Sequence, residues 1–269
     1  MTYKKITENP SNHDNLEKLN TLSILTKMNE EDKKVANAVT SVIPEITKLV
    51  DALAERFEKG GRLFYIGAGT SGRLGILDAS EIPPTFGMPH SRVVGIIAGG
   101  DTAIRKAVEN AEDNREQAWN DLMAFDINDT DVVVGIAASG TTPYVLGGID
   151  DAKKNGILTA GITNNPGSPL AEAADIGIAI NVGPEFVTGS TRMKSGTSQK
   201  LVLNMISTAL MIKIGRVKGN KMVNMQLSND KLVDRGTRYV MEGLGVDYAE
   251  AEKLLKKHGS VKAALDAGR

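Results

Sequence analysis

The 269-residue sequence contains no cysteine and only three histidines, His13, His90 and His258. The absence of cysteine excludes disulfides, thiolate nucleophiles and cysteine-ligated metal sites. The histidines lie far apart and no two have the spacing of metal ligands, so we expect no metal site. The chain also lacks both a signal-peptide core and a run of about 20 apolar residues, so we expect a cytoplasmic protein without a membrane span.

Neither sign of charge dominates the chain, which carries 32 basic and 33 acidic residues and a formal net charge of −1. A nucleic-acid surface or a polybasic membrane anchor usually leaves an excess of basic residues, so we expect neither partner. The length suffices for one large α/β domain with a small appendage.

Five short apolar segments rich in β-branched residues predict buried strands. Helical patterns separate them, and this alternation favours a mostly parallel five-stranded sheet with helices on both faces, a three-layer αβα sandwich. Before the first strand, apolar residues recur every three or four positions from Thr21, which predicts a helix that Pro44 kinks or divides. The predicted strands are residues 62–66, 92–98, 131–138, 158–163 and 175–182.

Three regions follow from these patterns. Residues 1–20 are polar and predict an N-terminal arm, and residues 21–240 predict the α/β domain. Residues 241–269 hold two short capped helices, too small for an independent domain, so we expect an appendage docked on the main body.

Two of the predicted helices have expected interruptions. The helix after the first strand should end before Pro83, and the helix over residues 103–124 should break near Asn110.

A glycine-rich turn follows the first predicted strand, in the segment RLFYIGAGTSGRLGILDASE at residues 62–81. Gly67, Gly69 and Gly72 lack Cβ atoms, so the backbone can turn sharply and be approached closely. Thr70 and Ser71 lie where a helix begins, and the free N–H groups of a first helical turn attract an anion such as phosphate. A tight strand-to-helix connection capped by Ser71 explains the turn equally well, because a short glycine pattern is a weak motif.

A second hydroxyl-bearing loop, Ser139, Gly140, Thr141 and Thr142, follows the third predicted strand. Ligands of parallel sheets bind beyond the carboxyl ends of the strands, where both loops are expected to lie. Two such loops at one edge favour a shared polyanionic ligand over two accidental connections.

A third hydroxyl-rich segment, residues 183–197, contains Glu185, Ser190, Arg192 and Lys194. Arg192 or Lys194 can place an anionic substrate group there. A solvated loop that enters a helix explains the same composition, and the two interpretations stay open.

Four long segments are GAGTSGRLGILDASEIPPTFG at 67–87, AGGDTAIRKAVENAEDN at 98–114, DVVVGIAASG at 131–140 and GPEFVTGSTRMKSGTSQKLVLNMIST at 183–208. In this order, they resemble the N-acetylmuramic acid 6-phosphate etherase family, which has the sugar isomerase (SIS) fold. The resemblance covers most of residues 6–240 and implies a bacterial enzyme of cell-wall sugar recycling. Such an enzyme cleaves the lactyl ether of muramic acid 6-phosphate, giving N-acetylglucosamine 6-phosphate and D-lactate, and we expect no cofactor.

The resemblance implies elimination followed by water addition. Opening of the sugar ring makes C1 an aldehyde and acidifies the proton on C2, which a base removes while an acid protonates the departing lactate. The family's catalytic glutamates match Glu81 in LDASE and Glu112 in NAEDN, and we assign Glu81 as the main acid/base and Glu112 as its partner. Without the resemblance, Glu81 is a helix-end residue and Glu112 a solvated helix residue.

The resemblance also implies phosphate binding by Thr70, Ser71, Ser139 and Thr142, and a homodimer with sites near the subunit boundary. Position 141 is threonine where the etherase pattern usually has arginine, so a bidentate cation is absent there.

Two other functions stay open from the sequence. One is a non-catalytic phosphosugar-binding regulator, similar to the glucokinase regulatory proteins. The other is an aldose–ketose phosphosugar isomerase, which the fold permits. Ala137 and Ala138 precede Ser139 where isomerase loops tend to carry further hydroxyls, which argues mildly against the isomerase.

Overall fold

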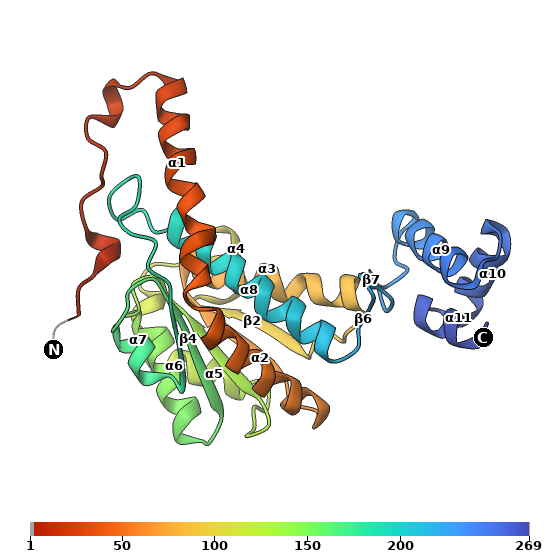
Figure 1. The fold of residues 1–269 in the computed structure, drawn as a ribbon. Helices are drawn as coiled ribbons and strands as arrows, with labels where there is room; N and C mark the ends of the chain where they lie inside the picture. Colours follow the sequence, from red (N-terminus) through yellow and green to blue (C-terminus); the bar gives the residue numbers. More distant parts are fainter. Residues whose placement is uncertain (1–2, 269) are drawn as a thin grey trace.

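The computed structural model describes residues 3–268, so the first two residues of the predicted arm and the last residue of the appendage lie outside it. A parallel five-stranded sheet with the order β2-β1-β3-β4-β5 lies between two layers of helices (Figure 1). The predicted αβα sandwich is confirmed. The strands are β1 (Leu63–Gly67), β2 (Val93–Ile97), β3 (Val132–Ile136), β4 (Leu158–Thr163) and β5 (Ile176–Ala179).

The sheet is apolar on both faces because helices cover both. Successive residues of β1 point to opposite faces: Leu63 and Tyr65 join one hydrophobic cluster, and Phe64 and Ile66 join the other. The first cluster packs under helices α2, α3 and α8, and the second under α5, α6 and α7. These helices are α2 (Ile43–Glu58), α3 (Gly69–Phe86), α5 (Gln117–Met123), α6 (Pro143–Lys154), α7 (Pro169–Ala173) and α8 (Lys194–Lys213).

The N-terminal helical segment divides at Pro44 as predicted. Helix α1 (Thr21–Thr40) ends shortly before it, and Pro44 lies in the first turn of α2, where a missing N–H costs no hydrogen bond. One end of α1 extends well beyond the sheet (Figure 1).

Helix α3 does not stop before Pro83, so that prediction is wrong. Pro83 and Pro84 lie inside its last turns, and the helix ends at Gly87, which has a φ of 63°. Ile82 and Phe86 are buried in the first cluster, and this packing outweighs the loss of two backbone donors.

The predicted helix over residues 103–124 is mostly absent. The chain breaks at Asn110, as expected, where φ is 61°. On either side stand only α4 (Gly100–Arg105), the short 3-10 helix η3 (Ala111–Asp113) and α5. The segment between α4 and α5 is therefore largely a loop.

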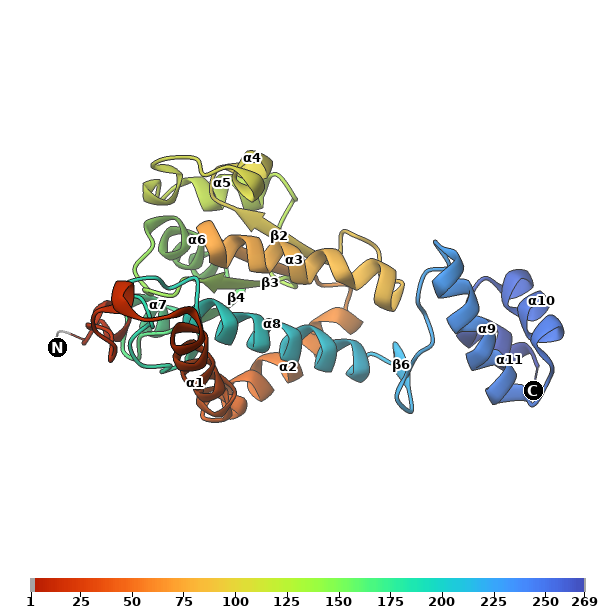
Figure 2. The same cartoon turned by 90° about the horizontal axis from the view of Figure 1, so that it is seen from above.

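The two short helices predicted in residues 241–269 are present, and a third helix over residues 230–244 shares with them a hydrophobic cluster that includes Val223 and Met225. A short hairpin leads into this unit, which lies beyond the end of α3 (Figures 1 and 2). The unit therefore begins before residue 240, and its connecting segment touches the main body, where Gln226 N–H donates to Pro84 O at 3.1 Å. The elements are β6 (Val217–Lys218), β7 (Lys221–Met222), α9 (Asp230–Leu244), α10 (Tyr248–His258) and α11 (Val261–Ala267).

Across residues 3–268, none of the helices combines the length and apolar character that a bilayer crossing requires.

Candidate active site

Two helices present open N-termini at the carboxyl edge of the sheet. Helix α3 follows β1, and its N-cap residue Ala68 makes no side-chain capping bond. Helix α6 follows the neighbouring strand β3, and its N-cap residue Thr142 makes none either. The first-turn N–H groups of both helices are thus available to an anion, and the two predicted loops lie at one edge.

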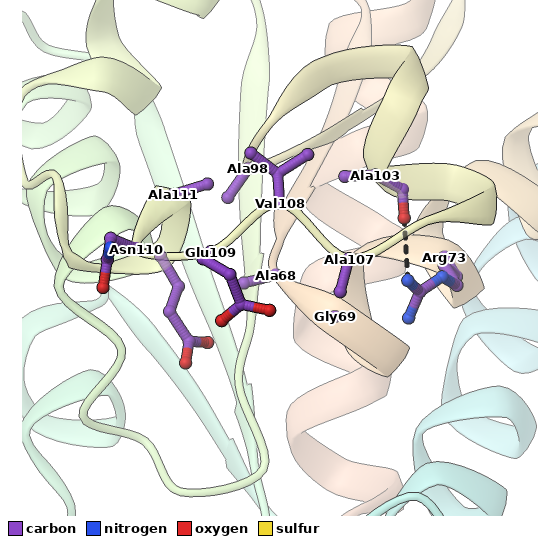
Figure 3. Close-up of a pocket in the computed structure, with 11 residues that line it drawn as sticks. Ala68, Gly69, Arg73, Ala98, Ala103, Ala107, Val108, Glu109, Asn110 and Ala111 are labelled. Atoms are coloured by element: carbon purple, nitrogen blue, oxygen red, sulfur yellow. Dashed lines mark hydrogen bonds between the residues drawn. The ribbon is translucent and has the colours of Figure 1, made fainter.

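A cavity of about 190 Å³ lies at the start of α3. Ala68 and Gly69 form one wall, and the loop between α4 and α5 forms the other with Glu109 and Glu112 (Figure 3). Both glutamates are exposed. The structure thus places a predicted catalytic carboxylate beside the predicted phosphate turn.

Arg73 on α3 binds the end of α4, from which the loop wall of this cavity begins. Its Nε donates to Ile104 O and its Nη2 to Ala103 O, both at 2.8 Å (Figure 3). The guanidinium therefore binds backbone of the wall.

The second loop is held in a compact form. Ser139 Oγ accepts from Thr141 N at 3.2 Å and from Thr141 Oγ1 at 3.1 Å. Gly140 has a φ of +69°, and a Cβ there would stand 2.1 Å from Ser168 Oγ, so only glycine fits. Asn165 also holds the loop, because its Nδ2 donates to the carbonyls of Ala138 and Ser139 at 3.0 and 3.2 Å.

The two hydroxyls of the first turn have different surroundings. Ser71 is buried, and its Oγ donates to Gln199 Oε1 on α8 at 2.9 Å. Thr70 is half-buried at the start of the helix. Ser71 thus joins α3 to α8, whereas Thr70 lies at the edge where a ligand can reach it.

Lys194 is buried, and its ammonium lies 2.6 Å from Glu31 Oε2 on α1. Burial alone would raise the pKa of Glu31, but hydrogen bonds from Lys194, Lys34 and His13 lower it to about 2. The charge of Lys194 is therefore engaged within the fold, which favours a structural role for this predicted site residue.

Glu185 and the two remaining predicted residues of this segment also differ. Glu185 is buried and accepts from the N–H groups of Lys194 and Ser195, so it caps the start of α8. Arg192 is exposed and forms no ion pair with another of residues 3–268. Ser190 is half-buried, and its carbonyl accepts from Met193 N at 3.1 Å.

Glu81 lies near the opposite end of α3 from Thr70. Eleven residues separate them, which is about 16 Å along the helix axis at the usual rise. Glu81 is exposed on a groove of about 150 Å³ between α3 and α8. One chain therefore does not bring Glu81 to the Glu112 cavity. The groove is lined by Leu74, Leu77, Asp78, Glu81, Lys200, Leu203 and Asn204.

A second carboxylate lies one turn before Glu81. Asp78 is buried and accepts from Tyr65 OH and Ser207 Oγ, each at 3.1 Å. Burial raises the pKa of Asp78 to about 6, although these two hydrogen bonds favour its charged form.

Sequence reasoning did not select Asp78, Glu109 or Asn165. Asp78 and Glu109 each lie three positions before a predicted glutamate, Glu81 and Glu112 respectively. That spacing is a usable signal only once the two glutamates have been selected. Asn165 lies in the Asn-Asn-Pro-Gly turn after β4, where turn chemistry alone accounts for it. Among residues 3–268, no group of three or more acidic or histidine side chains is placed to hold a metal ion.

Two protein-family models match parts of the chain. The model described as the glucokinase regulatory protein N-terminal SIS domain matches residues 45–153, and the SIS domain model matches residues 104–209. Among solved structures, a phosphoheptose isomerase from Francisella tularensis has a TM-score of 0.54 at 18% identity, over 72% of this chain and 100% of that chain. This likeness shows the fold alone.

Curated relatives match nearly the whole chain. The N-acetylmuramic acid 6-phosphate etherase of Christiangramia forsetii is 65% identical over 261 residues, which cover 97% of this chain and 95% of the relative. The N-acetylmuramic acid 6-phosphate etherase of Bacteroides fragilis is 62% identical over 266 residues, which cover 99% of this chain and 95% of the relative.

Proposed function

The chain belongs to the N-acetylmuramic acid 6-phosphate etherase family, and from this premise we propose which of its residues carry the reaction. The protein is a carbon–oxygen lyase that cleaves the D-lactyl ether of N-acetylmuramic acid 6-phosphate to N-acetylglucosamine 6-phosphate and D-lactate. The family favours this activity over the phosphosugar regulator and the isomerase. We place the enzyme in the cytoplasm, where its substrate would be a recycled cell-wall sugar.

The position of Glu112 is the main observation behind the proposed chemistry, because this residue lines the cavity at the uncapped N-terminus of α3. A phosphate held by that helix turn leaves the rest of the open-chain sugar within the cavity, next to a carboxylate. In the elimination, a base takes the C2 proton, the C3–O bond breaks, and an acid gives a proton to the leaving lactate oxygen. Water then adds to C3 of the unsaturated aldehyde. Glu112 takes one of the two proton-transfer roles.

Phosphate binding is assigned to the open turns of α3 and α6, with Gly69, Thr70, Ser139, Gly140 and the following two threonines around them. Neutral donors can hold a dianion where helix N-termini supply free N–H groups, and these two turns follow neighbouring strands. Ser71, Glu185 and Lys194 support these elements from buried positions rather than touch the ligand.

Glu81 is proposed to come from a second copy of the chain. The separation of about 16 Å from Thr70 exceeds the length of one hexose phosphate. The groove that bears Glu81 is lined by Leu77 of α3, which is half exposed, and a second apolar groove on the other side of α8 is lined by Met205 and by Ile43 and Ile46 of α2. Such a face suits the interface of a homodimer, and it would carry Glu81 toward the cavity of the other copy.

The first test is direct. Purified protein incubated with N-acetylmuramic acid 6-phosphate should release D-lactate, measured with a coupled D-lactate dehydrogenase. No D-lactate at high enzyme concentration would refute the assignment of the activity.

The second test asks whether the site is shared. Glu81→Gln and Glu112→Gln are each expected to lose about 10³-fold in rate. Equal amounts of the two inactive variants, unfolded together and refolded, should regain about a quarter of the wild-type rate, since half the dimers then hold one intact site of two. No recovery in such mixtures would place both glutamates of a site in one chain.

A further inference from the structure

The N-terminal arm, residues 3–19, lies against the carboxyl edge of the sheet beside the segment between β5 and α8 (Figures 1 and 2). It contains only two short 3-10 helices, η1 (Ile6–Glu8) and η2 (Leu16–Lys18). Its hydrogen bonds to the rest of the chain go to edge loops and α1: Thr7 to Asn165, Ser11 to Phe186 and Thr188, and His13 to Glu31. The arm therefore contributes to the edge that holds the ligand.

Thr7 and Asn165 form a buried reciprocal pair. Thr7 N donates to Asn165 Oδ1 at 3.2 Å, and Asn165 Nδ2 donates back to Thr7 Oγ1 at 2.9 Å. Both residues are almost fully buried, although 158 positions separate them. Because the pair is buried, removing either side chain leaves the polar atom of the other without a hydrogen-bond partner and without water to replace it.

This pair determines which way the Asn165 amide faces. The backbone N–H of Thr7 can only donate, so it requires the amide oxygen on its side. The carbonyls of Ala138 and Ser139 can only accept, so they require the amide nitrogen, which they contact at 3.0 and 3.2 Å. The arm thus keeps the Nδ2 donor of Asn165 directed at the backbone of the second loop.

The loop that Asn165 holds is the one assigned to phosphate. Asn165 O also accepts from Ser168 N at 3.1 Å, and Ser168 is the residue against which Gly140 packs. Ala138 O also accepts from Asn164 N at 3.0 Å and from Thr163 Oγ1 at 3.3 Å, so the contact that depends on the Asn165 amide is the one to Ser139 O, and a rotation of the amide would release that carbonyl.

We propose that the arm is part of the phosphosugar site, with Thr7 and Asn165 as positioning residues that keep the Ser139–Thr142 loop in its anion-binding shape. The proposal rests on the proposed function of that loop. Thr7 touches no reacting atom, so its loss should weaken phosphate binding and leave the chemical step largely intact.

The test compares two threonine-to-valine substitutions, one in the arm next to the carboxyl end of β4 and one near the first residue of β4. Thr7→Val removes the hydroxyl that accepts from Asn165, next to the carboxyl end of the strand. Thr159→Val removes an equally buried hydroxyl at its other end, which donates to Asp175 Oδ2 at 2.8 Å and accepts from Asp175 N at 3.0 Å. Both variants should lower the Tm.

Only Thr7→Val should raise KM, by about fivefold, which is the size expected for the loss of one neutral hydrogen bond. Its kcat should stay within about twofold of wild type. The Kd of inorganic phosphate, measured by titration calorimetry, should rise by the same factor. Thr7→Ser restores the hydroxyl and should return both values to near those of wild type. A chain that starts at Ser11 lacks the whole pair and should show the same changes, larger in size.

Two results would overturn the proposal. One is unchanged KM and phosphate affinity in both Thr7→Val and the shortened chain. The other is an equal loss in Thr159→Val, which would mean that lowered stability alone causes the effect. The phosphate titration does not require catalysis. If the wild-type protein released no lactate, the proposed activity would be refuted, but the effect of the arm on phosphate affinity could still be measured.

Discussion

The two ends of helix α3 differ in what surrounds them. At its start, the uncapped helix end and the exposed carboxylates of Glu109 and Glu112 border a cavity whose walls mix polar side chains with alanines. At its far end, Glu81 lies on a groove that includes three leucines and the buried carboxylate of Asp78. The first end can bind a polyanion in one chain, whereas the second has an apolar surface that another protein surface can cover.

This difference supports the proposal that one chain contributes to two different sites. A buried, packed helix keeps the two ends about 16 Å apart, because its length follows from the residue rise and α3 runs unbroken through Pro83. Closing the distance within a chain would require breaking the helix that the core holds in place. Assembly of two chains avoids that cost.

The largest expected effect comes from breaking the far end with Leu77→Arg. Leu77 is 50% exposed beside Glu81, so the change should leave the fold intact, but like charges would meet across a twofold interface. We expect monomers in analytical ultracentrifugation and a loss of lactate release of about 10²-fold or more, since each site loses one carboxylate.

Met123→Arg is the matched control, because Met123 is 52% exposed at the end of α5, on the other face of the sheet. It should keep the wild-type rate and mass. A dimeric, active Leu77→Arg enzyme would contradict the division of the site.

A smaller effect is expected at the start of α3, where Thr70→Val should mainly change KM and Ser71→Ala should mainly change the Tm. Thr70 is placed to donate to a charged phosphate, so its loss should raise KM by about tenfold with little change in Tm. Ser71 donates to Gln199 instead, so Ser71→Ala should lower the Tm by about 2–4 °C and change KM less than about threefold. The reverse pattern, in steady-state kinetics and thermal melts, would mean that the two hydroxyls exchange roles when ligand binds.

The sheet and its functional edge are predictable from local sequence. Buried parallel strands are continuous apolar runs, and the predicted bounds of β1 and β3 agree with the observed ones within about two residues. Because parallel connections bring all carboxyl ends to one edge, the order of strands and helices along the chain suffices to place the turns at Gly69 and Ser139 together.

The roles of single polar residues are less predictable, because they depend on partners distant in sequence. Lys194 looks like a free cation in a hydroxyl-rich loop, yet Glu31 binds it from 163 positions away. Nothing local to Asn165 reveals that Thr7 reaches it across the edge. Tertiary burial also carries α3 past Pro83, which local propensity disfavours.

The smallest expected effect concerns the buried carboxylate at the far end of α3. Folding raises the pKa of Asp78 from its usual 3.8 to about 6, mainly by burial, so between these values the folded protein binds more protons than the unfolded one. Its contribution to stability is therefore greatest below about pH 4 and falls as the pH rises through 6. Relative to Asp78→Asn, the wild type should lose on the order of 2–3 kcal/mol of unfolding free energy between pH 4 and 7, in urea titrations at one protein concentration.

Tyr65→Phe sharpens the same prediction, because it removes a hydrogen bond that favours the charged form of Asp78. The pKa of Asp78 should then rise further, and the fall in stability should extend to higher pH than in the wild type. Parallel pH curves for wild type and Asp78→Asn would mean that folding leaves the pKa of Asp78 near its usual 3.8. The groove end of α3 would then carry a buried charge from about pH 4 upward, and its contrast with the phosphate end would rest on Leu77 and its neighbours alone.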